Sequence, residues 1–336
     1  MTNFPFCEAE VGQFSKSIAL SGASGYLGKN ILAGLSGDGN WTVIPLFRSA
    51  TNVHGQANVR AVSGDLLLPD TLNGWLSDYC TVVHAAYMWR AGRAANLKAA
   101  EALVQACRQA KVRRLVHIST AAVSGRSPSS WVDEETPCCP VTEYGQTKLE
   151  IEQFLVEAAR AHGFDLVILR PTSVYGPHGT SLVKLCQELR SSSWPKNYLR
   201  ASLFGRRAMN LVHIDHVVAA IRFVIEIPNR LNGAVFIVSE DDTLANNFRD
   251  VEHIARQMLG LNEYPLPIFS CPQFILETLL RALGRNIVNP SCRFSGGRLK
   301  ALGFEQPQNF EKCLREYFAW MHSTLPRSET MVTRIS

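Results

Sequence analysis

The chain has 336 residues, of which 46% are hydrophobic and 19% charged, and its formal net charge is +5. This composition excludes a disordered chain, and the length suits one large domain or one and a half, with enough apolar residues for a core. No block of like charges appears, so we expect no nucleic-acid partner and regard an anionic small molecule as the better candidate ligand.

Signals for export, membrane insertion and metal binding are not evident in the sequence. The first residues show no basic segment followed by an apolar one, and no apolar run is long enough for a membrane span. The nine cysteines form no CxxC pair and fit neither a zinc module nor a disulfide framework. We therefore expect a reduced, cytoplasmic protein with no metal and no membrane partner, in which Cys138 and Cys139 are free thiols rather than a redox switch.

The first half of the chain alternates short apolar runs with helical patterns. The runs are continuous rather than alternating, which is typical of strands buried on both faces. The predicted strands lie at 17–21, 41–47, 59–63, 81–86, 113–119 and 164–170. Predicted helices lie near 25–36, 93–110 and 143–162. This alternation predicts an α/β protein with a doubly wound parallel sheet of the Rossmann type.

After Pro171 the pattern loosens and becomes mainly helical. Helices are predicted near 180–191, 215–227, 246–260, 272–284 and 309–322, with a strand at 234–239. We expect a Rossmann domain over 15–175 that carries the catalytic residues. A smaller, mostly helical C-terminal substrate-binding region is expected over 176–324, with some elements returning to the core, and a disordered tail over 325–336.

A glycine-rich loop follows the first predicted strand. It reads Gly22-Ala-Ser-Gly25-Tyr-Leu-Gly28 and leads into a helix. Gly22 would allow a tight turn, Gly25 a close approach of backbone to phosphate, and Gly28 close packing of helix on strand. A plain glycine-rich turn is the alternative, but the strand before and the helix after favour dinucleotide binding. The predicted cofactor contacts in the loop are Gly22, Ser24, Gly25, Tyr26 and Leu27.

The residue after the second strand indicates which dinucleotide is bound. An acidic residue there holds the ribose of NAD, whereas an arginine accommodates the extra phosphate of NADP. Here the residue is Arg48, and no Asp or Glu occurs from Trp41 to Gly64. We therefore favour NADP (NADPH) over NAD, a solvated surface arginine being the alternative. Asp65, with Leu66 beside it, is placed to meet the adenine or to cap its own turn.

Tyr144 and Lys148 lie four residues apart at the start of a predicted helix, which puts both on one face. A cation near a phenol lowers the pKa of the Tyr toward a range useful for proton transfer. The strand before this helix ends in Ser119-Thr120, and ligands of open α/β sheets bind at the carboxyl ends of the strands. A hydroxyl and a Tyr–Lys pair would thus donate a hydrogen bond and a proton to one substrate carbonyl. The alternative is that Ser119 only hydrogen-bonds a backbone group at the end of the strand.

From about Ser17 to Trp320 the chain resembles the extended short-chain dehydrogenase/reductases, the group of NAD(P)-dependent sugar epimerases, dehydratases and ketoreductases. The segments that carry the resemblance are GASGYLG, VVHAA, NLKAAEAL (which begins at Asn96), HISTAAVSG, DEETPCCPVTEYGQTK, RPTSVYGP and NLVHIDHVVAA. They occur in the family's order.

The resemblance implies roles for individual residues. The implied catalytic residues are Thr120, Tyr144 and Lys148, and Lys148 would also hold the ribose. The implied cofactor contacts, beyond the loop, Arg48, Asp65 and Leu66, are Ala85, Ala86, Ser119, Tyr144, Lys148, Pro171 and Ser173. The implied substrate contacts are Thr120, His178 and the pair Arg206 and Arg207, which would replace an arginine that stands as Met209 here; a solvated basic pair is the alternative.

Two departures from the family pattern bear on the reaction and on other possible sites. Ala121 and Ala122 stand where the family's 4,6-dehydratases carry acidic residues, which disfavours dehydration. His213 and Asp215 could suggest a metal or acid–base site, but a strand-end His and an Asp capping the next helix explain them more simply.

We predict an NADP-preferring reductase that transfers hydride to a ketone, on a nucleotide-linked sugar, with Tyr144 as proton donor. The alternatives are an epimerase with tightly bound NAD, a reductase of a hydrophobic ketone of the steroid or flavonoid type, and a catalytically silent NADP-binding regulator. The resemblance also implies a homodimer formed through the helices at 93–110 and 143–162.

Overall fold

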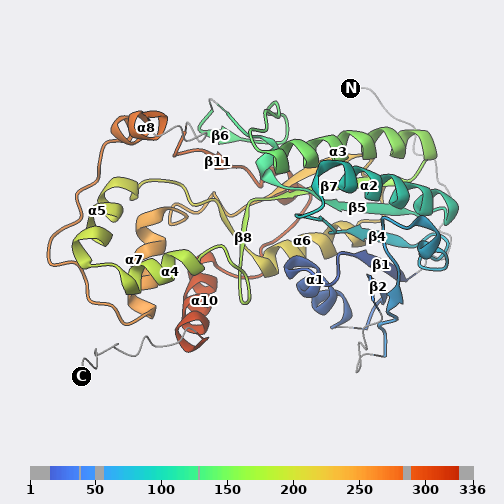
Figure 1. The fold of residues 1–336 in the computed structure, drawn as a ribbon, viewed down its shortest axis with the longest axis horizontal. Helices are drawn as coiled ribbons and strands as arrows, with labels where there is room; N and C mark the ends of the chain where they lie inside the picture. Colours follow the sequence, from blue (N-terminus) through green and yellow to red (C-terminus); the bar gives the residue numbers. More distant parts are fainter. Residues whose placement is uncertain (1–15, 38, 50–56, 128, 283–288, 325–336) are drawn as a thin grey trace, which may run out of the picture. The chain divides into compact units, whose positions relative to one another are not determined.

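The computed structural model describes residues 16–37, 39–49, 57–127, 129–282 and 289–324. Its centre is a seven-stranded sheet in the order β10-β7-β5-β4-β1-β2-β3 (Figure 1). The strands are β1 (Ser17–Ser21), β2 (Thr42–Phe47), β3 (Val62–Ser63), β4 (Thr81–His84), β5 (Arg114–Ile118), β7 (Asp165–Pro171) and β10 (Ala234–Val238). From β1 the chain adds strands first on one side and then on the other. The predicted Rossmann-type parallel sheet is confirmed.

The described residues also form α-helices, some of which connect and cover these strands. They are α1 (Tyr26–Ser36), α2 (Gly92–Gln109), α3 (Glu143–His162), α4 (Val183–Ser191), α5 (Trp194–Phe204), α6 (Ile214–Glu226), α7 (Phe248–Met258), α8 (Gln273–Ala282), α9 (Gly297–Ala301) and α10 (Phe310–Thr324). Two short 3₁₀ helices are η1 (Pro69–Leu72) and η2 (Ala121–Val123). Within the described ranges, no helix combines the length and apolarity that crossing a membrane requires.

The chain forms two compact units. The first unit consists of Met1–His117, Gln153–Val167 and Pro228–Gly233. The second unit consists of Ile118–Glu152, Ile168–Ile227 and Ala234–Ser336. Each unit is therefore assembled from three separate segments of the chain.

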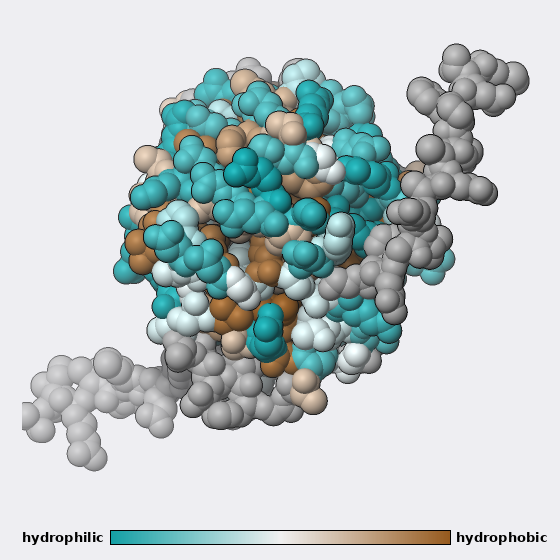
Figure 2. Space-filling model, turned by 90° about the vertical axis from the view of Figure 1, so that its right-hand side faces the viewer, coloured by the Kyte–Doolittle hydropathy of each residue, from teal (hydrophilic) through white to brown (hydrophobic). Residues whose placement is uncertain are grey.

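The core of the first unit explains why its strands are continuous apolar runs. Ala19 and Leu20 of β1, Val82 and Val83 of β4 and Leu115 of β5 are fully buried. Figure 1 shows α1 and α2 on opposite sides of these strands, so both faces are covered. The molecular face in Figure 2 is mostly hydrophilic, with apolar residues between the polar ones, as the segregation of apolar side chains to the core requires.

A buried ion pair fixes the third segment of the first unit. Arg114 at the start of β5 and Asp165 at the start of β7 lie 2.7 Å apart. The carboxylate of Asp165 also accepts hydrogen bonds from the backbone N–H groups of Leu231 and Asn232. Arg114 in turn donates to the carbonyl oxygen of Asn229 at 2.6 Å. The segment Pro228–Gly233 is thus held by charged side chains rather than by a strand ladder.

The second unit has its own core, built mainly by three helices. Apolar residues of α4, α7 and α10 form one buried cluster together with Tyr175 and Leu211. Two short parallel strand pairs complete the unit: β6 (Trp131–Val132) with β11 (Arg293–Phe294), and β8 (Ser173–Tyr175) with β9 (Leu211–His213).

Several local predictions need correction. Helix α5 was not predicted, and the predicted strand 59–63 is paired as a strand only at Val62–Ser63, with a single bridge from Val43 to Val59. Asp215 does not cap the helix that follows β9: the cap is His213, whose Nδ1 accepts the N–H of Asp215, so Asp215 lies in the first turn. The predicted tail 325–336 and the end of the predicted helix 272–284 lie outside the described residues.

Candidate active site

The glycine-rich loop connects β1 to α1 in the first unit, and two of its glycines are required by space. Gly22 has a φ of +77°, and a Cβ on it would lie 2.6 Å from the backbone N of Ala86. A Cβ on Gly28 would lie 2.0 Å from the carbonyl oxygen of Gly22. The loop therefore packs backbone to backbone against the end of β4 and the start of α1, as close helix–strand packing at a dinucleotide loop requires.

The outer side of this loop is accessible. Ser24 and Gly25 are exposed, and Tyr26 and Leu27 are half-buried. Gly25 occupies the N-cap position of α1, and no side chain there accepts a hydrogen bond from the first turn. The N–H groups of that turn can therefore serve an anion, which is how such loops hold a pyrophosphate.

Asn96 fixes the chain that follows the predicted cofactor contacts Ala85 and Ala86, both half-buried. Its Oδ1 accepts the N–H of Met88 at 2.8 Å, and its Nδ2 donates to the carbonyl oxygens of Met88 and Gly92. The buried side chain thus replaces a secondary-structure ladder in this loop. Its role follows from these local bonds.

Arg48 and Asp65, which we predict to contact the adenosine part of the cofactor, also belong to the first unit. Arg48 is exposed and follows directly on β2. The Oδ1 atom of Asp65 accepts the N–H of Leu67 at 2.9 Å, so this side chain caps its own turn, and Leu66 beside it is buried. A cofactor role for Asp65 and Leu66 stays a prediction.

The second unit contains Thr120, Tyr144 and Lys148. Thr120 follows β5, and its Oγ1 accepts the N–H of Ala122 at 3.2 Å, which caps η2. Tyr144 is half-buried in the first turn of α3, and Lys148 is buried one turn later. The Nζ atom of Lys148 donates to the carbonyl oxygen of Ile118 at 2.8 Å, which ties α3 to the end of β5.

Burial lowers the pKa of Lys148 to about 8, and the nearby carboxylate of Glu152 partly opposes this shift. The ammonium form is therefore the main form at neutral pH, but the pKa of Lys148 lies only slightly above neutral pH. A cation at this place can stabilise a phenolate one helical turn away.

Glu152 and Arg170 are site residues that the sequence analysis missed. Glu152 lies one turn after Lys148 on α3, and Arg170 near the end of β7 donates to its two oxygens at 2.6 and 3.1 Å. The hydroxyl of Ser119 also donates to Glu152, and all three side chains are buried. The hydroxyl of Ser119 is thus engaged inside the protein. The signal for Glu152 was its spacing, since it continues the face that carries Tyr144 and Lys148.

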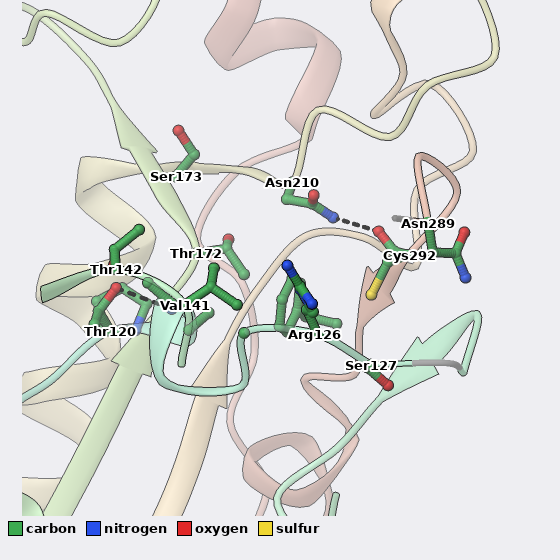
Figure 3. A pocket seen from close by; sticks show the side chains of 15 residues that line it. Thr120, Arg126, Ser127, Val141, Thr142, Thr172, Ser173, Asn210, Asn289 and Cys292 are labelled. Atoms are coloured by element: carbon green, nitrogen blue, oxygen red, sulfur yellow. Dashed lines mark hydrogen bonds between the residues drawn. The ribbon is translucent and has the colours of Figure 1, made fainter. Parts of the chain in front are cut away.

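A cavity of about 390 Å³ opens beside Thr120 in the second unit (Figure 3). Three predicted residues, Thr120, Pro171 and Ser173, line it together. The residues that complete its wall and were not predicted include Arg126, Val141, Thr142, Asn210, Cys292 and Phe294. The structure thus collects, in one cavity, the hydroxyl that we predict to be catalytic and two residues expected at the nicotinamide.

Three predicted substrate residues do not line this cavity. His178 is exposed, with a φ of 65°, and its ring contacts that of Trp320 edge to face at 5.1 Å. Arg206 is exposed and Arg207 half-buried, just beyond the end of α5. In the part of the chain that the structure describes, no group of three or more His, Cys, Asp or Glu could hold a metal ion.

Comparison with known proteins places this geometry in a family. The model of the NAD dependent epimerase/dehydratase family matches residues 18–238. Among curated proteins, a 4-hydroxy-2-methyl-3-oxo-4-farnesyl-3,4-dihydroquinoline-1-oxide ketoreductase of Stigmatella aurantiaca is 32% identical over 49% of this chain and 52% of its own length. A UDP-glucose 4-epimerase of Azospirillum brasilense is 30% identical over 52% of this chain and 57% of its own length. The chain thus spans about half the length of the curated relatives it matches.

Solved structures share the fold of this chain. A UDP-glucuronic acid 4-epimerase from Bacillus cereus in complex with NAD gives a TM-score of 0.69 at 17% identity, over 91% of this chain and 96% of the other. DesIV, a dTDP-glucose 4,6-dehydratase from Streptomyces venezuelae with NAD and TYD bound, gives 0.65 at 22% identity, over 92% and 97%. These likenesses concern the fold, whereas the family model covers more than half of the sequence. The chain belongs to the NAD-dependent epimerase/dehydratase family.

Proposed function

We propose that this protein is an NAD(P)-dependent ketoreductase in which Tyr144 protonates the oxygen of a substrate ketone. The observation that carries the proposal is the position of Thr120 in the wall of the cavity, next to the helix that bears Tyr144 and Lys148. The bound nicotinamide would supply the hydride, and the protein would supply the proton and the stabilisation of the developing alkoxide.

Thr120 is suited to donate a hydrogen bond to the substrate. Its Oγ1 already accepts the N–H of Ala122, so one lone pair is used and the hydroxyl hydrogen is left for another partner. A ketone oxygen in the cavity can accept this hydrogen. The bond strengthens as negative charge develops on that oxygen, which favours the transition state over the ground state.

Tyr144 would give its proton to the same oxygen, and Lys148 would make this possible. A phenol near its ordinary pKa of about 10 is a weak acid at neutral pH, and a nearby cation stabilises the phenolate that remains after transfer. The carboxylate of Glu152 favours the charged form of Lys148 in a buried place. The proton donor therefore depends on a chain of three residues along one face of α3.

The residues of the first unit fit a dinucleotide. Gly22 and Gly28 allow the backbone-to-backbone packing that any Cβ would prevent, and the first turn of α1 offers N–H groups to a pyrophosphate. Gly22, Ser24, Gly25, Tyr26 and Leu27 would hold the phosphates, and Arg48 the extra phosphate of NADP. Ala85 and Ala86 would lie along the rest of the cofactor, and the predicted nicotinamide contacts Pro171 and Ser173 belong to the second unit. NADPH as the preferred form rests on Arg48 alone.

The names of the relatives support two candidate substrate classes. The Stigmatella aurantiaca protein is named as a ketoreductase of a farnesylated quinoline, which favours reduction of a ketone on a hydrophobic body. Others are named as enzymes of UDP-glucose and dTDP-glucose, which favours a nucleotide-linked sugar. Epimerisation with tightly bound NAD is the second candidate reaction, because the Azospirillum brasilense relative is a 4-epimerase.

Two measurements test the proposal. Native mass spectrometry of the purified protein should show a site that fills with NADPH in preference to NADH, whereas stoichiometric bound NAD would favour the epimerase. NADPH oxidation should then be followed with nucleotide-linked keto-sugars and with hydrophobic ketones. Tyr144→Phe should lose at least 100-fold in turnover, about the lower bound for loss of general acid catalysis. Equal turnover by both proteins would overturn the proposed mechanism.

Two further predictions concern the whole protein. We propose a homodimer through α2 and α3, which sedimentation velocity would test, and a cytoplasmic location, which fractionation of the source cells would test.

A further inference from the structure

Asn210 is a wall residue of the cavity whose orientation is fixed by two acceptors. Its Nδ2 donates to Oδ2 of Asp241 at 2.6 Å and to the carbonyl oxygen of Cys292 at 2.9 Å. An amide NH₂ group has two hydrogens, so both are used. The amide oxygen must then point away from these two partners, because a flipped amide would place oxygen against two acceptors.

The amide oxygen of Asn210 is an acceptor without a partner among the described residues. The side chain is half-buried, lies between β8 and β9, and lines the cavity. Figure 3 shows it across the cavity from Thr120, with its nitrogen directed to Cys292. A ligand that reaches this wall therefore meets an oxygen and must offer a hydrogen.

Asp241 holds this arrangement in place from behind the wall. Its carboxylate is buried and also accepts the N–H of Phe294 at 2.8 Å and the Nδ2 of Asn246 at 2.8 Å. Phe294 lines the cavity as well. Burial raises the pKa of Asp241 to about 6, so the group is ionised at neutral pH and acts as an acceptor only.

The rest of the cavity wall between Thr120 and Asn210 is largely apolar. Ala121, Val141, Pro171 and Phe294 contribute to it. Several of the polar residues already have local partners: Thr142 accepts the N–H of Gly145, and Asn289 accepts the N–H of Ser291. Thr120 offers a hydroxyl donor at one end of the wall and Asn210 an amide acceptor at the other, and Arg126, Ser127, Thr142 and Ser173 are further polar residues of the wall.

We propose that the substrate is a hydroxyketone, with its carbonyl oxygen at Thr120 and a hydroxyl group that donates to Oδ1 of Asn210. This inference rests on the proposed ketoreductase function and adds the second recognition point. Asn210 is then a specificity residue, and Asp241 is a positioning residue that acts through it. The hydroxyl could belong to a nucleotide-linked keto-sugar or to a hydroxylated aromatic ketone, since both present the same pair of groups.

The test compares ketones that differ only in this donor. para-Hydroxypropiophenone and its methyl ether represent the aromatic source, and a thymidine diphosphate keto-sugar with free and with methylated ring hydroxyls represents the sugar source. The wild-type protein should prefer the free hydroxyl by about 3- to 10-fold in kcat/KM, the value of one hydrogen bond. A preference among the aromatic ketones identifies an aromatic substrate, and a preference among the keto-sugars identifies a nucleotide-linked sugar.

Asn210→Gly removes the amide while allowing the φ of 50° that Asn210 adopts. The ratio of kcat/KM between free and methylated ketone should fall to near one. Asn232→Gly is the matched control, because Asn232 also has a φ of 50° and is exposed in the first unit. This control should keep the wild-type ratio.

Calorimetric binding of the same ketone pairs is measured with the wild-type protein and with Asn210→Gly. It distinguishes failure of the reductase function from failure of the hydroxyketone inference. Absence of turnover together with a binding preference that Asn210→Gly abolishes would overturn the reductase function and support the hydroxyl contact. A preference that survives in Asn210→Gly, or no preference in either source, would overturn the hydroxyketone inference even if reduction occurs.

Discussion

The ammonium group of Lys148 and the carboxylate of Glu152 lie one turn apart on α3, and both are buried. Burial disfavours the charged form of Lys148, whereas the attraction of the Glu152 carboxylate favours it. Arg170 shares the carboxylate, with its nearer nitrogen 2.6 Å away. The charge state of Lys148, the proposed catalytic lysine, therefore depends on Glu152. In the part of the chain that the structure describes, Glu152 belongs neither to the cavity wall nor to the glycine-rich loop.

Glu152→Gln should change both stability and the pH profile. The free energy of unfolding should fall by about 3 kcal/mol, because Arg170 keeps a buried charge without its partner. The pKa of Lys148 should also fall, so the decline of kcat at alkaline pH should begin at lower pH than in the wild type. Urea unfolding and a pH–rate profile measure the two effects. Glu157→Gln, on an exposed site of the same helix, should change neither.

Lys148 itself should give stability a distinct dependence on pH. Its pKa is about 8 in the folded protein and 10.5 as the ordinary value, so between these values the unfolded chain binds the proton and the folded protein does not. The free energy of unfolding should then rise with pH over this window, by at most about 1.4 kcal/mol per pH unit. Lys148→Met should lack this rise and should also lose turnover. An identical slope in both proteins would contradict the assignment.

Gly22→Ala should be far more damaging than a glycine substitution at an open site. An added Cβ would meet the backbone of Ala86 at 2.6 Å, and neither backbone can move without disturbing β4 or the loop. Gly39, with a φ of +67° and open space around it, is the control and should cost only about 1 kcal/mol of backbone strain. Gly22→Ala should lower the midpoint temperature of thermal unfolding and weaken NADPH binding, whereas Gly39→Ala should still bind NADPH.

Asp165→Asn should destabilise the protein strongly. The change leaves Arg114 with a buried charge and weakens the hold on the segment Pro228–Gly233, at a cost of about 3 to 5 kcal/mol. Glu135→Gln removes an exposed ion pair with Arg298 and should change stability by less than about 1 kcal/mol. Urea midpoints with unchanged m-values would measure the difference. Equal losses in the two variants would show that burial of the pair does not matter.

The sequence allowed prediction of the elements whose pattern is local. Strands β1, β4 and β5 are continuous apolar runs because both faces are covered, and their boundaries were predicted to within two residues. The strand pairs β6–β11 and β8–β9 were not predicted, because each strand has only two or three residues and its partner is distant in the chain. Helix α5 begins in a Ser- and Pro-containing stretch that is also typical of loops.

The same limit applies to the candidate site. The Tyr144–Lys148 pair could be proposed from a helical spacing and a hydroxyl of Ser119-Thr120 from a strand end, whereas the choice of Thr120 came from the family resemblance. Arg170 and Asn210 could not be proposed, because their significance comes from Glu152 and Asp241, partners that only the folded chain brings within hydrogen-bond distance. Buried polar contacts between distant segments leave no periodic signal in the sequence.

The segment Pro228–Gly233 has a consequence for how the protein is made. Asp165, Arg114 and Leu166 all bond to it, so the first unit lacks these partners until the ribosome has added Gly233. Nascent chains shorter than this expose a charged pair without its backbone partners. Completion of the first unit is thus delayed until about two thirds of the polypeptide has been synthesised, and chaperone contact with the nascent chain should be greatest before that point.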